Sequence, residues 1–117
     1  MEGPIYRKTT EFSVGVIGLC NELKRNHEFT ISEQLLKAGT SIGANVNEAA
    51  SAQSRKDFIS KMSIAQKEAR EAKYWLIILS DSKTIDYNYS KLLNDIEEII
   101  KILSKIIITA KNNLNKK

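Results

Sequence analysis

Apolar side chains recur at helical spacing in the segment 5–26. They lie three or four residues apart, on one side of a helix, and are Phe12, Val16, Leu19 and Leu23. The same kind of spacing predicts further helices at 31–53, 55–80 and 89–113, separated by polar breaks. Because long helices joined by short breaks form antiparallel neighbours, we predict an all-α fold over residues 1–117, a single antiparallel up-down-up-down four-helix bundle.

The second predicted helix is thin. Its start resembles a capping box, in which the Thr30 hydroxyl accepts a backbone N–H and Glu33 reaches back. Gly39 and Gly43 lie four residues apart within it. A phosphate-binding loop would need Lys and Ser or Thr after the second glycine and a preceding strand, and neither is present. We therefore interpret the glycines as positions of close helix packing. The buried stripe of this helix is predicted to contain Ile31, Leu35, Ala38, Ile42, Val46 and Ala49.

The third and fourth helices carry the longest apolar patterns. A second capping signal, Ser54 to Asp57, precedes a heptad seam, which is typical of near-parallel packing. The seam consists of Phe58, Met62, Ala65, Ala69, Ala72, Leu76 and Leu79. The fourth helix has two apolar rows, and so much apolar surface needs more cover than a small bundle gives, which indicates assembly. These rows are Leu92, Ile96, Ile99, Leu103, Ile106 and Ala110, and then Leu93, Ile100, Ile107 and Leu114.

The composition is that of an ordinary globular domain. The chain has 117 residues, of which 42% are hydrophobic and 27% charged, with a net charge of +4. Cys20 is the only cysteine and His27 the only histidine, so we expect a cytoplasmic protein without disulfides. No signal peptide is evident, and no apolar run reaches the ~20 residues that a membrane span needs, so no membrane partner is expected.

Three blocks of this sequence resemble a known family. They are Gln34–Ala49, Ser54–Ile59 and Lys67–Trp75, and their order and spacing are similar to those of the bacterial proteins named for 23S rRNA intervening sequences. The resemblance implies a four-helix bundle that assembles into a ring-like homopentamer. It also implies similarity to the accessory protein of diversity-generating retroelements, which binds nucleic acid and works with a reverse transcriptase. The family has no established enzymatic activity, so the resemblance supplies neither catalytic residues nor a cofactor.

Basic residues are the main functional candidates. We predict that they bind RNA, DNA or an RNA–protein assembly, because a ring would repeat each basic patch and strengthen phosphate contact. On a monomer the same residues would be an ordinary solvated face. The alternative is a protein-interaction scaffold whose lysines serve only solubility. The candidates are Arg7, Lys8, Arg55, Lys56, Lys101, Lys105 and Lys111.

Four polar residues near the predicted seams permit two interpretations. They could form an acid–base site, or a buried hydrogen-bond network that fixes helix register, and we predict the network. They are Asn45, Glu48, Arg70 and Glu71.

Catalysis and metal binding find little support in the sequence. His27 lacks the Glu-x-x-His partners of a metal-binding bundle, so no metal site and no enzyme activity are expected.

The aromatic residues are assigned by their place in the pattern. Tyr74 and Trp75 could stack on bases, but core or subunit interface fits their place beside the seam better. Tyr87 and Tyr89 are predicted to be surface aromatics near a loop.

Overall fold

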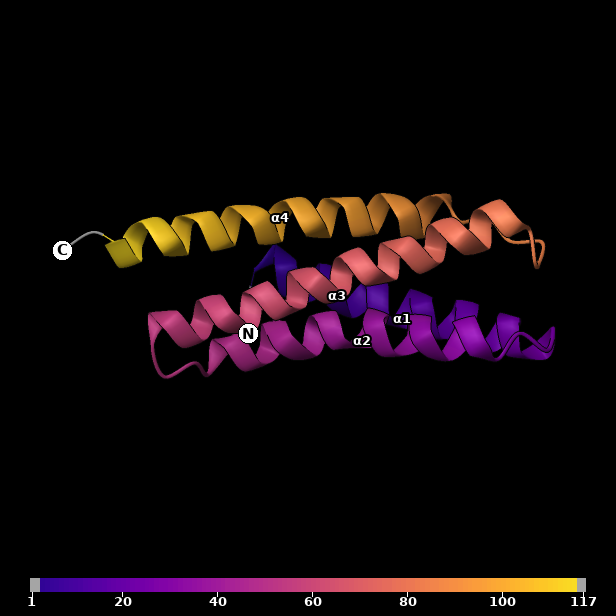
Figure 1. Cartoon of the computed structure of the whole chain (residues 1–117), viewed down its shortest axis with the longest axis horizontal. Coiled ribbons are helices and arrows are strands. Elements are labelled where there is room, and N and C mark those ends of the chain that lie inside the picture. The colour runs from indigo at the N-terminus through magenta and orange to yellow at the C-terminus, as the bar shows by residue number, and fades with distance from the viewer. Residues whose placement is uncertain (1–2, 116–117) are drawn as a thin grey trace.

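Four helices account for nearly all of the fold in the computed structural model, which describes residues 3–115 (Figure 1). They are α1 (Pro4–Arg25), α2 (Thr30–Ala50), α3 (Arg55–Ser82) and α4 (Ser90–Asn115). The four-helix prediction is confirmed, and every bound lies within three residues of the predicted one. The described residues contain no strand.

Each helix packs against two others. Within residues 3–115, α1 lies next to α2 and α4, and α3 lies next to the same two helices, but the backbones of α1 and α3 do not approach each other closely. Between α1 and α2, the Tyr6 hydroxyl donates to the Val46 carbonyl at 3.4 Å, whereas Cys20 and Ser32 bond near the other end. Residue numbers therefore rise along α1 as they fall along α2. Figure 1 shows the three connections at the ends of an elongated bundle.

The predicted apolar stripes form the core. The four stripe residues of α1 are fully buried, and the alanines of the α3 seam are buried between large neighbours. Ile31 and Phe58 are half-buried, so the stripes begin one turn later than predicted. In α4 the buried row ends at Ile107 rather than Ile106, because the two apolar rows share the cover of α1 and α3. Only Ile108 is strongly exposed there, while Leu93, Ile100, Ile102 and Ile106 are half-buried against the core.

The glycines of α2 allow α1 to approach closely, as predicted. A Cβ at Gly39 would lie 3.0 Å from both Val16 methyl groups, and one at Gly43 would lie 3.3 Å from the Thr9 hydroxyl oxygen. Ser13 on α1 also donates a hydrogen bond to the Gly39 carbonyl at 3.3 Å. These contacts confirm close helix packing at both glycines.

The predicted capping box at Thr30 is wrong. The helix begins one residue earlier, because Phe29 already has helical backbone angles, so the Thr30 hydroxyl lies inside the first turn. The carboxylate of Glu28 instead accepts the Ile31 backbone N–H at 2.8 Å. An acceptor outside the helix thus satisfies one of its free donors.

The second capping signal is confirmed. The Ser54 hydroxyl accepts the Asp57 backbone N–H at 3.0 Å, as a serine N-cap does. The Asp57 carboxylate accepts the Gln53 backbone N–H at 3.3 Å. The pair fixes where α3 starts, immediately after the connection from α2. No helix among the described residues is long and apolar enough to cross a bilayer.

Candidate nucleic-acid interface

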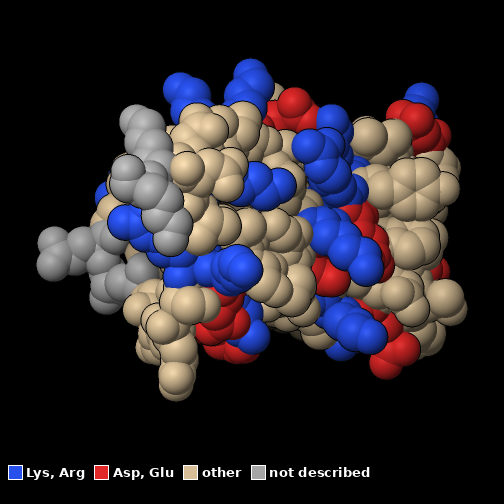
Figure 2. Space-filling model, turned by 60° about the vertical axis from the view of Figure 1, so that its left-hand side comes forward, with Lys and Arg blue, Asp and Glu red and all other residues tan. Residues whose placement is uncertain are grey.

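The seven predicted basic residues gather over one half of the bundle. Lys8 near the start of α1 pairs with Glu98 of α4 at 2.6 Å. Gln66 of α3 donates to Ser104 of α4, so the first half of α3 lies along the second half of α4. The start of α3 and the end of α4 therefore lie at one end of the bundle, whereas α1 begins further toward its middle (Figure 1). Figure 2 brings this end forward and shows blue side chains spread over it.

Three acidic side chains in this half form ion pairs with lysines. Glu98 pairs with Lys8, Glu48 with Lys61 at 3.7 Å, and Glu97 with Lys73. Because Lys8 is already paired with Glu98, its ammonium group is less available to bind a phosphate. The other six candidates form no ion pair among residues 3–115 and are exposed: they are Arg7, Arg55, Lys56, Lys101, Lys105 and Lys111. We call these six the basic end.

The polar network predicted around α2 is wrong. The Asn45 amide donates to the Ser41 carbonyl of its own helix at 2.8 Å, so it does not bridge to a neighbour. Glu48 is exposed and its partner is Lys61. Both residues lie beside the buried stripe rather than within it, and a one-residue rotation about a helix decides whether a side chain meets water.

Arg70 belongs to the basic surface and not to a network. It is exposed, and the pKa of the Glu97 carboxyl is lowered first by Lys73 and then also by Lys101 and Arg70. Arg70 of α3 and Lys101 of α4 therefore lie near the same carboxylate and extend the basic end across two helices. The fourth predicted member, Glu71, instead accepts the Trp75 indole N–H at 3.4 Å. The heptad pattern could have predicted this position, because Arg70 directly follows the seam residue Ala69 and so lies outside the seam.

The aromatic residues divide between surface and core. Tyr74 is 57% exposed and meets Trp75 edge to face, with ring centroids 5.4 Å apart, while Trp75 is half-buried. The prediction that Tyr89 is a surface aromatic is wrong, because only 6% of it is exposed. Tyr87 is half-buried and packs edge to face on Tyr89. The connection before α4 folds back on α3 and covers the Tyr89 ring. No local sequence signal predicts this arrangement.

Reactive groups are few among the described residues. The Cys20 thiol is buried and donates to the Ser32 carbonyl at 3.3 Å, and burial raises its pKa. No three His, Cys, Asp or Glu side chains in the part of the chain that the structure describes lie together as a metal site would require.

Fold and surface together define an all-α four-helix bundle with a basic end. The family model described as 23S rRNA-intervening sequence protein matches residues 2–105. The chain belongs to this family, as the sequence resemblance indicated. A crystal structure of a Bacteroides thetaiotaomicron protein of unknown function from the S23 ribosomal protein family is similar, with 45% identity and a TM-score of 0.85. The match covers 89% of this chain and 98% of that one. Comparison with curated proteins gives no significant match.

Proposed function

We propose that the protein is a non-enzymatic homo-oligomeric bundle that binds nucleic acid, either RNA or an RNA–protein assembly, through its basic end. The observation that carries the proposal is the gathering of six exposed cations without acidic partners among the described residues. Such cations release the counterions of a phosphate backbone, which gives affinity without sequence specificity. The name of the family and the net charge of +4 agree with a polyanionic partner.

The oligomer is proposed as a ring of antiparallel up-down-up-down bundles. Contact pairs support this direction of the helices, since Lys73 meets Glu97 whereas Gln66 meets Ser104 further along α4. Ring assembly is supported by two separate apolar faces. Val14 on α1 is 65% exposed and Tyr74 on α3 is 57% exposed, and the backbones of α1 and α3 are not close neighbours.

Two unlike faces on opposite helices favour a head-to-tail contact, which closes into a ring if the rotation per subunit allows. Gly15 of α1 lies against Leu92 of α4, which places Val14 and Ile17 level with the start of α4. The last turns of α3, including Ile77, lie at this same height, just before the connection to α4. Exposed apolar side chains thus lie at similar heights on α1 and α3, which supports a head-to-tail contact. Five subunits are the number that the family resemblance implies.

Charge removal tests the nucleic-acid proposal. The double variant Lys101→Gln with Lys105→Gln should weaken binding of labelled RNA in fluorescence anisotropy. Its slope of log affinity against log salt should fall by about 0.7 for each phosphate of a single strand that the variant no longer neutralises. The matched control is Lys24→Gln with Lys37→Gln, which removes the same charge from exposed positions outside the basic end. Equal reductions of affinity in both variants would refute a localised site, and no salt-sensitive binding by the native protein would refute the proposal.

Light scattering tests the assembly separately. Val14→Asp should convert the oligomer to smaller species, because a carboxylate would be buried in the proposed contact. Phe29→Asp is the matched control, since Phe29 is an exposed apolar residue in the connection between α1 and α2. A native protein that is monomeric at micromolar concentration would contradict the ring. If it is oligomeric but binds no RNA or DNA, the exposed apolar side chains outside the proposed contact, Phe29 and Ile108, favour a protein partner instead.

A further inference from the structure

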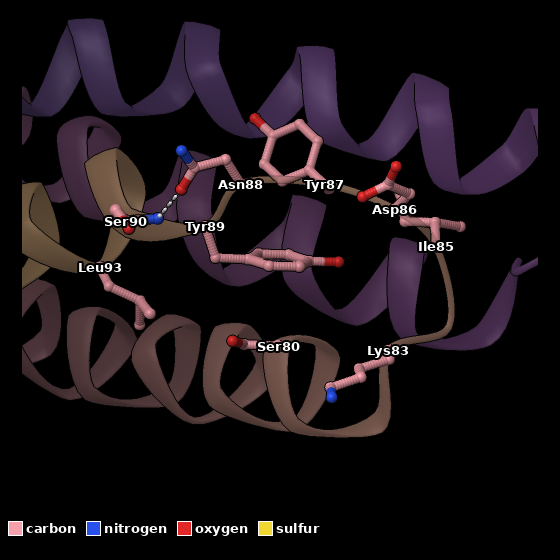
Figure 3. A pocket seen from close by; sticks show the side chains of 9 residues that line it. All are labelled: Ser80, Lys83, Ile85, Asp86, Tyr87, Asn88, Tyr89, Ser90 and Leu93. Carbon is pink, nitrogen blue, oxygen red and sulfur yellow. Dashed lines mark hydrogen bonds between the residues drawn. The ribbon is translucent and has the colours of Figure 1, made fainter.

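The connection between α3 and α4 forms a pocket of about 510 Å³ (Figure 3). Its walls combine the Tyr87 and Tyr89 rings with the side chains of Ile85, Ser80, Lys83 and Asp86. Pockets that hold small ligands have volumes of about 300–1,000 Å³ and pair apolar walls with a few polar groups. The pocket therefore has the size and lining of a small-molecule site, and it lies apart from the basic end.

The Tyr89 hydroxyl is the unusual group of this pocket. It is buried and has no hydrogen-bond partner among the described residues. A buried hydroxyl without a partner carries a desolvation cost, and such groups in native proteins call for an explanation. Burial, and then Tyr87, raise the pKa of this phenol, so it keeps its proton at neutral pH and is ready to donate. Figure 3 shows the Tyr89 ring between Tyr87 and Ser80, with its hydroxyl directed to the side that carries Lys83 and Asp86.

Lys83 and Asp86 give this side of the pocket both signs of charge. The two exposed side chains do not form an ion pair with each other. Lys83 also ends α3 in the left-handed backbone region, with φ of 54°. Helices usually place glycine there, since a side chain at this position costs stability. Lys83 thus lines the pocket in a backbone conformation that glycine adopts at lower cost.

We propose that this pocket binds a free α-amino acid with a large apolar side chain. Its carboxylate would meet the Lys83 ammonium and, after a small shift of the connection that uncovers it, the Tyr89 hydroxyl. Its ammonium group would meet the Asp86 carboxylate. Its side chain would lie against Ile85 and Tyr87. A simple anion would be repelled by Asp86 and a simple cation by Lys83, so the lining favours a zwitterion over either. This site is independent of nucleic-acid binding and goes beyond the proposed function.

NMR titration of the full chain tests the proposal, with L-leucine as the probe. Leucine should saturably shift the amide resonances of residues 80–93 at concentrations up to about 10 mM. Acetate and propylamine, which each carry one of its two charges, should not produce these shifts at equal ionic strength. Absence of saturable shifts with leucine would overturn the proposal. Equal shifts with acetate would overturn it too, because the pocket would then be only an anion site.

Variants assign the contacts. Lys83→Gly, Asp86→Asn and Tyr89→Phe should each weaken leucine binding about 5- to 10-fold, the reduction expected for one hydrogen bond or charge contact. His27→Gly is the matched control for Lys83→Gly, because His27 has the same left-handed backbone, with φ of 63°, outside the pocket. It should leave leucine binding unchanged. Unchanged affinity in the three pocket variants would refute the assigned contacts.

The stability of the ligand-free Tyr89→Phe protein provides a second readout. Its melting temperature should equal or exceed that of the native protein, because the variant removes a buried hydroxyl that lacks a partner. A clear decrease would show that the hydroxyl is already bonded in the free protein, and the argument from its missing partner would fail.

Discussion

Replacing Gly39 by alanine measures how closely α1 and α2 approach. In an open helical position, glycine to alanine stabilises a helix by about 1 kcal/mol. At Gly39 the new methyl group would lie 3.0 Å from both methyl groups of Val16, which is fully buried. Val16 cannot move aside easily, because β-branched residues have one strongly preferred rotamer in a helix. Overpacking of this kind costs about 1–3 kcal/mol, so the gain is cancelled or reversed.

Gly18 supplies the matched control. A Cβ there would meet no atom within 4 Å, so Gly18→Ala should gain the full ~1 kcal/mol. The two variants make the same chemical change in helix interiors and should differ in unfolding free energy by about 1–3 kcal/mol. Urea unfolding followed by circular dichroism measures this difference, with light scattering to ensure that both variants assemble as the native protein does.

A double variant isolates the contact itself. Val16→Ala removes the two methyl groups that face Gly39, so adding Gly39→Ala to it should cost less than in the native background. The coupling energy expected for residues in contact is about 0.5–3 kcal/mol. If Gly39→Ala alone stabilised the protein as much as Gly18→Ala, the close approach of the two helices would be refuted.

Three further predictions concern caps, charge and the thiol. Ser54→Ala should lower the free energy of unfolding by about 1 kcal/mol, because it removes the N-cap of α3. Thr30→Ala should leave it unchanged, and urea unfolding measures both. Equal decreases in the two variants would show that Thr30 is an N-cap after all. Lys73 lowers the pKa of the Glu97 carboxyl from its ordinary value of 4.5. The ionised Glu97 therefore stabilises the fold above pH 4.5, and this stabilisation is lost as the pH falls through the lowered pKa of the folded protein. In thermal unfolding measured at a series of acidic pH values, Lys73→Gln should therefore lose less stability below pH 4.5 than the native protein does. An equal loss in both proteins would refute the Lys73–Glu97 ion pair. Cys20 should react with a thiol reagent only as fast as the protein opens, since it is buried with a raised pKa, and rapid labelling of the native protein would contradict its burial.

Some of this molecule follows from the sequence because the physics is local or periodic. The heptad seam of α3, from Met62 to Leu79, is buried as predicted, since a helix with one apolar side has only one way to shield it. Gly39 and Gly43 pack closely against α1, as the two glycines one turn apart in the small-residue helix predicted. The Ser54 cap also follows from its own residues and their immediate neighbours.

Positions beside the seams could not be predicted in this way. Asn45 and Arg70 lie one step from buried stripe residues, and small rotations of α2 and α3 turn them away from each other. Helix rotation is set by the packing of all four helices, which no single segment encodes. The six residues of the basic end were each identifiable from the sequence. That Arg70 and Lys101 both lie near the Glu97 carboxylate depends on the register of α3 against α4.

The sequence by itself determined four amphipathic helices, their approximate ends and kinship with the 23S rRNA-intervening sequence family. Hydrophobic burial is periodic along a helix, so the spacing of apolar residues in the sequence predicts it. Only the tertiary structure decided which charges pair, which cations share the basic end, and that Tyr89 is buried beneath the connection before α4. These outcomes depend on distances between segments far apart in the chain, and such distances are fixed only when the helices pack.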